Sequence, residues 1–136
     1  GVVESMKLAL DDAEISPESI GYINAHGTGT RLNDPLECRA IKRVFGDRSV
    51  KLPVSSSKSL FGHAMGASSA LEALATLLAV QNDCAPPTLN CDDLDPECVI
   101  DPVPYNSRKV QIEAALSNSF AFGGSNAVLV FRKWKP

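Results

Sequence analysis

The stretch from residue 64 to residue 81 constrains the fold of this chain more than any other part of the sequence. It is almost continuously apolar or small, and as a helix it would be about 27 Å long. A membrane span is the competing interpretation, but Glu72 lies in the middle, and serines and alanines dominate the first half. We therefore expect a helix buried inside a globular protein, without a role in a membrane.

Short apolar runs on both sides of this helix are typical of β-strands. They occupy residues 20–25, 51–55, 112–116 and 127–131. Two more helices are predicted. One follows the amphipathic pattern that opens the chain, and one runs from Asn-Asp-Pro at residue 33 to Gly46.

Five prolines between residues 83 and 108 predict a long connection with little regular structure. The order of the elements predicts one α/β unit with a mixed sheet flanked by helices, whose functional residues lie at the ends of strands.

Composition and charge exclude several classes of protein. The chain is 44% hydrophobic and 21% charged, which excludes a disordered chain. Thirteen Lys and Arg against sixteen Asp and Glu leave no basic field for a nucleic-acid partner. The four cysteines form no CxxC pair. This favours free thiols in a reducing compartment and a cytoplasmic protein, rather than disulfides or a zinc site.

Both histidines of the chain lie in runs of glycine and small residues, His26 within residues 24–30 and His63 within residues 58–67. Glycine lets the backbone turn and lets a ligand approach closely, so we expect the two to share a pocket. His63 precedes the apolar helix, and the helix dipole together with Lys58 favours a neutral imidazole there. Two neutral imidazole donors facing one carbonyl would stabilise an enolate, which suits carbon–carbon bond chemistry at a thioester. The alternative is that both histidines are structural.

Glu72 raises a separate question, because a carboxylate in an apolar helix needs a cation or a shifted pKa. An ion pair with Lys58 would satisfy it. A bound hard cation would do the same, with oxygen ligands from Asn24, Ser117 and Asn118 at strand ends. An exposed Glu72 is the third alternative.

Four motifs in a fixed order carry a resemblance to a known family. They are His-Gly-Thr-Gly-Thr at 26–30, Lys58 followed by Gly-His at 62–63 and Gly-Ala at 66–67, Pro-Pro-Thr at 86–88, and Asn-Ser-Phe-Ala-Phe-Gly-Gly at 118–124 followed by Asn126. Over essentially all 136 residues, the chain resembles the carboxyl-terminal half of a β-ketoacyl-acyl carrier protein synthase, with the thiolase-like fold. Gly1 is not an initiator methionine and stands at the start of a helical pattern, so we also expect a segment of a longer polypeptide.

The resemblance implies roles for individual residues. His26 and His63 would be the active-site histidines that promote decarboxylation of malonyl-carrier protein, and Lys58 would organise the site electrostatically. Phe122 would be the substrate gate, with its backbone N–H in the oxyanion hole. The remaining roles are substrate binding by Thr28, Thr30, Phe120 and Gly123, and a structural cation at Asn24, Glu72, Ser117 and Asn118.

The resemblance also implies a reaction and partners. The parent enzyme would condense acyl and malonyl thioesters in fatty acid biosynthesis as a homodimer, with phosphopantetheine arriving on acyl carrier protein and no redox cofactor. The nucleophilic cysteine of the family lies in its amino-terminal half, and none of the four cysteines here has its strand-to-helix setting. This chain alone is therefore expected to be inactive.

Two alternatives to this function stay open, and a third is disfavoured. A ketosynthase domain of a polyketide synthase shares the same motifs, and so would a non-catalytic chain-length or carrier-protein-binding partner. A thiolase is disfavoured, because residues 117–124 lack the second catalytic cysteine of that class.

Overall fold

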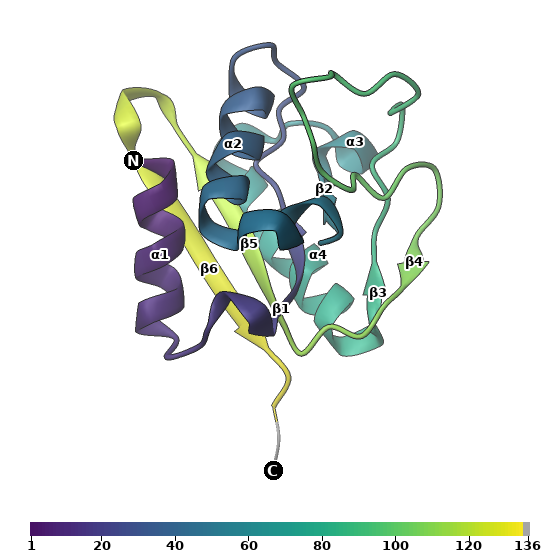
Figure 1. The fold of residues 1–136 in the computed structure, drawn as a ribbon. Helices are drawn as coiled ribbons and strands as arrows, with labels where there is room; N and C mark the ends of the chain where they lie inside the picture. The colour runs from purple at the N-terminus through teal and green to yellow at the C-terminus, as the bar shows by residue number, and fades with distance from the viewer. Residues whose placement is uncertain (135–136) are drawn as a thin grey trace.

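A four-stranded sheet lies between two helical layers in the computed structural model, which describes residues 1–134 (Figure 1). The strands are β1 (Ile20–Asn24), β2 (Val54–Ser55), β5 (Ala114–Phe120) and β6 (Asn126–Arg132), in the order β2-β1-β5-β6. Strand β1 is parallel to β2 and β5, whereas β5 and β6 are antiparallel. The predicted α/β unit with a mixed sheet flanked by helices is confirmed.

Helices α1 (Val2–Asp12) and α2 (Asn33–Phe45) cover one face of the sheet, and α4 (Ser68–Asn82) covers the other (Figure 1). Successive residues of a strand point to opposite faces, so β1 contributes to both cores. Ile23 packs with the α1 and α2 side chains, whereas Tyr22 packs with Val80 of α4. Both faces of β1 are thus buried, which explains why its sequence is apolar without alternation.

The strand predicted at residues 51–55 is shorter than expected. Only Val54 and Ser55 pair with β1. The segment before them is a 3₁₀ turn over Gly46–Val50, and Pro53 has no N–H to donate to a neighbouring strand. A four-residue helix that was not predicted, α3 (Lys58–Phe61), follows β2.

The long connection predicted between residues 83 and 108 is largely irregular, as expected. A two-residue antiparallel pair closes its base, formed by β3 (Cys84–Ala85) and β4 (Arg108–Lys109).

Helix α4 differs from the predicted buried helix in both its start and its orientation. It begins at Ser68, after a 3₁₀ turn over Met65–Ala67. Its polar residues Glu72 and Thr76 are buried, because they meet polar partners from β1 and α3. Its leucines therefore point outward and are 40–56% exposed: Leu71, Leu74, Leu77 and Leu78. None of the helices within residues 1–134 has the length and apolar character needed to cross a membrane.

Candidate active site

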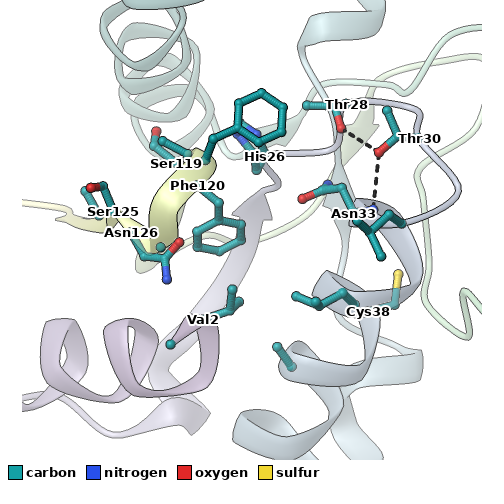
Figure 2. Close-up of a pocket in the computed structure, with 18 of the residues that line it drawn as sticks. Val2, His26, Thr28, Thr30, Asn33, Cys38, Ser119, Phe120, Ser125 and Asn126 are labelled. Carbon is teal, nitrogen blue, oxygen red and sulfur yellow. Dashed lines mark hydrogen bonds between the residues drawn. The ribbon is translucent and has the colours of Figure 1, made fainter.

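The candidate site lies where β1, β2 and β5 end and where α4 begins. His26 follows β1, Lys58 follows β2, and Phe120 ends β5. The parallel strands β1 and β2 end at the same edge of the sheet, which brings their following residues together. The ring centroids of His26 and His63 are 6.0 Å apart with perpendicular planes, and that of Phe120 is 5.6 Å from His26. Both histidines line one open cleft of about 1880 Å³, as the sequence predicted. Figure 2 shows His26 and Phe120 at this cleft.

The loop that carries His26 is fixed by a glycine and a buried carboxylate. Gly27 has φ of +40°, and a Cβ there would lie 2.5 Å from Cβ of Ser56. The backbone N–H of His26 donates to Oε1 of Glu37 and that of Gly27 donates to Oε2, both at 2.9 Å. Sequence reasoning missed Glu37. Its signal was its place four residues before Ile41, on the buried face of α2.

Burial raises the pKa of Glu37, and hydrogen bonds from Gly27 N–H, the Asn118 side chain and His26 N–H oppose that rise. Asn118 Nδ2 donates to Glu37 Oε1 at 3.0 Å. One carboxylate therefore ties the His26 loop to strand β5, where Asn118 lies.

Lys58 contacts His26 and Glu72 through a buried ammonium group. Its Nζ donates to the backbone oxygen of His26 at 2.6 Å and to the carboxylate of Glu72, and it lies 3.4 Å from Nδ1 of His26. An ammonium group can only donate, so Nδ1 of His26 accepts and the ring proton is on Nε2. From the sequence, the charge of Lys58 was predicted to act on His63. The turn of α3 directs Lys58 to His26 instead.

The charge state of His26 follows from its surroundings. Burial is the main cause that lowers the pKa of His26 to about 4, and the neighbouring Lys58 and His63 lower it further. His26 is therefore neutral near pH 7, with Nε2–H as its donor.

His63 has the same tautomer for a different reason. The backbone N–H of Met65 donates to Nδ1 of His63 at 3.1 Å, and Ser68 Oγ lies 3.0 Å from the same nitrogen. Since a backbone N–H cannot accept, Nδ1 must be the acceptor and Nε2 carries the proton. The cleft is thus lined by two imidazoles whose free donors are both Nε2–H groups.

Glu72 forms the ion pair with Lys58 that the sequence allowed, with side-chain exposures of 1% and 5%. Burial raises the pKa of Glu72, and the hydrogen bond and charge of Lys58 oppose this rise. Asn24 lies against the same turn of α4, donating to the backbone oxygen of Glu72 at 3.0 Å and to Thr76 Oγ1 at 3.1 Å. The alternative of an exposed Glu72 is therefore wrong.

The four residues named for a cation, Asn24, Glu72, Ser117 and Asn118, are all buried. Two of their side-chain oxygens, Glu72 Oε2 and Asn118 Oδ1, have no hydrogen-bond partner among the described residues. Within residues 1–134, no group of three or more His, Cys, Asp or Glu side chains could hold a metal ion. A cation here would depend on amide, hydroxyl and single carboxylate oxygens, which are ligands of hard cations.

The turn after β5 presents Phe122 to solvent, fully exposed at the rim of the cleft. Gly123 and Gly124 complete this turn with φ of +82° and +83°, in the left-handed region that favours glycine. Across the cleft, Thr28 and Thr30 have hydroxyls 3.2 Å apart, and Thr30 Oγ1 accepts from the backbone N–H of Asn33 at 3.2 Å (Figure 2). The predicted gate and substrate-binding residues thus lie on two sides of the histidines.

All four cysteines are free. Cys38 and Cys98 are buried, and burial is the main cause that raises the pKa of both thiols. Since the thiolate is the nucleophilic form, the setting of these two cysteines opposes a role as the acyl-accepting group.

Known proteins resemble this chain over nearly all of its length. The sequence model of a family described as "Beta-ketoacyl synthase, C-terminal domain" matches residues 1–92. Over 133 residues, the chain is 50% identical to a 3-oxoacyl-[acyl-carrier-protein] synthase 2 from Coxiella burnetii, covering 98% of this chain and 32% of that protein. The chain spans about a third of the length of the curated relatives it matches.

Solved structures give the same result. The ishigamide ketosynthase/chain length factor matches with a TM-score of 0.95 and 42% identity, over 99% of this chain and 33% of that one. A type II polyketide synthase acyl-carrier protein in complex with its ketosynthase, bound to the hexaketide, matches with a TM-score of 0.96 and 37% identity, over the same shares of the two chains.

Proposed function

We propose, because the chain belongs to the family of the beta-ketoacyl synthase C-terminal domain, that the protein carrying it is a 3-oxoacyl-[acyl carrier protein] synthase of fatty acid biosynthesis. The observation that carries this proposal is the pair of neutral Nε2–H donors from His26 and His63 in one cleft. Neutral donors suit an oxyanion that develops during the reaction, since they stabilise it without transferring a proton to it beforehand.

The two histidines would act on the malonyl thioester. Its carbonyl oxygen accepts from both Nε2–H groups, and the bond between the carboxylate carbon and Cα breaks with release of CO₂. The electron pair of that bond passes into the enolate, whose oxyanion the two donors stabilise. The low pKa of His26 keeps its ring neutral throughout.

The enolate carbon would then attack the acyl thioester on a cysteine supplied from outside these 136 residues. The backbone N–H of Phe122 would stabilise the oxyanion of the tetrahedral adduct, and collapse of the adduct would expel the cysteine thiolate and give the 3-oxoacyl product. Lys58 holds His26 through two contacts, with its backbone oxygen and with Nδ1, and pairs with Glu72; it touches no reacting atom in this scheme.

The cleft suits a substrate carried on a flexible arm. Thr28 and Thr30 offer hydroxyls on one side, Phe120 and the exposed Phe122 lie on the other, and Gly123 belongs to the turn that carries Phe122. We therefore include acyl carrier protein as partner, with its phosphopantetheine arm as part of the substrate, and a homodimer as the working assembly. The acyl-carrier protein bound to a ketosynthase among the similar structures supports the first of these.

We also propose a structural cation at Asn24, Glu72, Ser117 and Asn118. The support is that Glu72 Oε2 is buried without a hydrogen-bond partner among the described residues. A cation there would satisfy this oxygen on the face of the sheet that α4 covers, whereas the side chain of Asn118 lies on the other face, against Glu37 of α2.

The test measures CO₂ release from malonyl-carrier protein, and condensation, by the protein that carries this chain. We expect His26→Ala and His63→Ala each to lower kcat by about 10²–10³-fold, the cost of removing one oxyanion donor. Lys51→Ala, an exposed residue remote in sequence from both histidines, is the control and should leave the rate unchanged. Unchanged decarboxylation in both histidine variants, with folding intact, would make the histidines structural and remove the proposal.

Product analysis separates the two catalytic alternatives. A 3-oxoacyl product that is reduced and extended as a fatty acid supports the proposal, whereas a poly-β-keto product would assign the protein to polyketide synthesis. A protein that binds carrier protein but neither decarboxylates nor condenses would be a non-catalytic chain-length partner.

A further inference from the structure

We propose that Ser68 is a positioning residue that holds His63 in its Nε2–H tautomer and fixes the direction of that donor. The proposal rests on the proposed function, in which this N–H stabilises the enolate. Ser68 is the first residue of α4, is 4% exposed, and has its Oγ 3.0 Å from Nδ1 of His63.

The direction of the Ser68 hydrogen bond follows from a second contact. Met65 N–H already donates to Nδ1 of His63, so that nitrogen carries no hydrogen. A serine hydroxyl can donate or accept, and here only donation is possible. Ser68 O–H therefore donates to Nδ1. A ring flip would break both hydrogen bonds at once, and a proton on Nδ1 would break the Met65 hydrogen bond and force the Ser68 hydroxyl to turn and accept.

The two donors differ in what they fix. Met65 N–H belongs to a backbone turn two residues from His63, with Met65 at φ of +50°. Ser68 belongs to the helix, whose buried face is packed against the sheet. The Ser68 contact thus ties the imidazole to the rigid part of the fold, whereas Met65 alone would let ring and turn move together.

A purely structural role for the Ser68 hydroxyl is the competing explanation, since serine at a helix start is often a cap. The residue before it, Ala67, occupies the N-cap position of α4, and no side-chain hydrogen bond caps this helix. Ser68 Oγ instead contacts the imidazole of His63. The hydroxyl therefore serves the histidine rather than the helix.

The test reads the tautomer directly, without depending on activity. In the protein that carries this chain, labelled with ¹⁵N-histidine, the Nδ1 and Nε2 shifts of His63 report which nitrogen holds the proton. The signals are identified by their loss in His63→Asn. We compare the wild type with Ser68→Ala, Ser68→Thr, which keeps a hydroxyl, and Ser69→Ala, the exposed neighbour on the same helix.

We expect Ser68→Ala to raise the ratio of the Nδ1–H to the Nε2–H form about 3- to 10-fold, the effect of losing one neutral hydrogen bond. The kcat for malonyl-carrier protein decarboxylation should fall by a similar factor with KM unchanged. Ser68→Thr should restore both values toward the wild type, and Ser69→Ala should change neither.

A His63 tautomer ratio in Ser68→Ala equal to that of the wild type would overturn the positioning role, whatever the activity. A shifted ratio with full decarboxylation by both Ser68→Ala and His63→Ala would instead keep the contact and overturn the proposed function. The two failures are therefore distinguishable.

Discussion

The buried ion pair between Lys58 and Glu72 makes a quantitative prediction for Lys58→Met. Methionine keeps most of the apolar stem and removes the ammonium group. The carboxylate of Glu72, 1% exposed, then loses the positive charge of Lys58, while its Oε2 already has no hydrogen-bond partner among the described residues. The backbone oxygen of His26 loses a donor at 2.6 Å. Breaking a buried ion pair by removing one partner costs about 3–5 kcal/mol, and we expect a loss of unfolding free energy in this range at pH 8.

Replacing both partners should cost less than the single change suggests. In Lys58→Met/Glu72→Gln the buried charge is absent, so the main penalty of the single variant disappears. We expect the two changes to deviate from additivity by about 1.5–3 kcal/mol, in the direction that makes the double variant more stable than the sum.

The pH dependence gives the prediction a sign. Burial raises the pKa of Glu72, and in Lys58→Met the opposing hydrogen bond and charge are gone, so the pKa rises further. An acid whose pKa is raised on folding stabilises the native state below its unfolded pKa, and that stability is lost as the pH rises through the folded pKa. The penalty of Lys58→Met relative to wild type should therefore be smallest below about pH 4, near the unfolded pKa of glutamate, and should grow as the pH rises.

Urea unfolding of the four proteins in this cycle, at several pH values between 4 and 8, measures the effect. Lys51→Met, which removes an exposed lysine, is the control and should change stability by less than about 0.5 kcal/mol. If the two changes add within about 0.5 kcal/mol and the penalty of Lys58→Met is the same at every pH, the carboxylate of Glu72 does not depend on the charge of Lys58.

Three further predictions follow from the same site. Gly27→Ala should cost about 1–3 kcal/mol of stability and lower decarboxylation, because its Cβ would lie 2.5 Å from Cβ of Ser56 at a φ of +40°. Thermal melting and kcat test this prediction, and an unchanged kcat would contradict it. Glu37→Gln should cost about 1–3 kcal/mol, because an amide N–H would face one of the two backbone N–H groups that the carboxylate now accepts; urea unfolding tests it, with the exposed Glu4→Gln as control. Exchange of sodium and potassium for tetramethylammonium should lower the melting temperature of the wild type but not of Glu72→Gln, if the buried Glu72 Oε2 holds a cation. An equal response of the two proteins would remove the cation.

Much of the fold could be predicted from local sequence patterns. Helix α2 begins at Asn33 and has Gly46 at its C-cap, and β1 delivers His26 at its carboxyl end, as the sequence indicated. The orientation of α4 could not be predicted in this way. Its residues are apolar on nearly every side, so periodicity singled out no buried face. The side that turned inward is the one whose polar groups find partners on β1 and α3.

Glu37 shows the same limit within the site. A glutamate on the buried face of an amphipathic helix is visible in the sequence, but its role depends on two N–H groups of a loop ten and eleven residues earlier and on Asn118 of β5. Such a role requires three segments to meet, which no local pattern encodes.

The sequence by itself determined which groups are available: two histidines among glycines, Lys58 shortly before the second of them, Glu72 in an apolar helix, and glycines at turns that need positive φ. These features depend on side-chain chemistry and on short-range backbone geometry. Only the tertiary structure decided which groups meet. It directed Lys58 to His26 rather than to His63, and it set Met65 N–H and Ser68 against Nδ1 of His63. Tautomers and pKa values depend on neighbours within a few ångströms. For His26 that neighbour is Lys58, 32 residues away in the sequence, whereas for His63 the neighbours are two and five residues away and depend on how the turn before α4 folds.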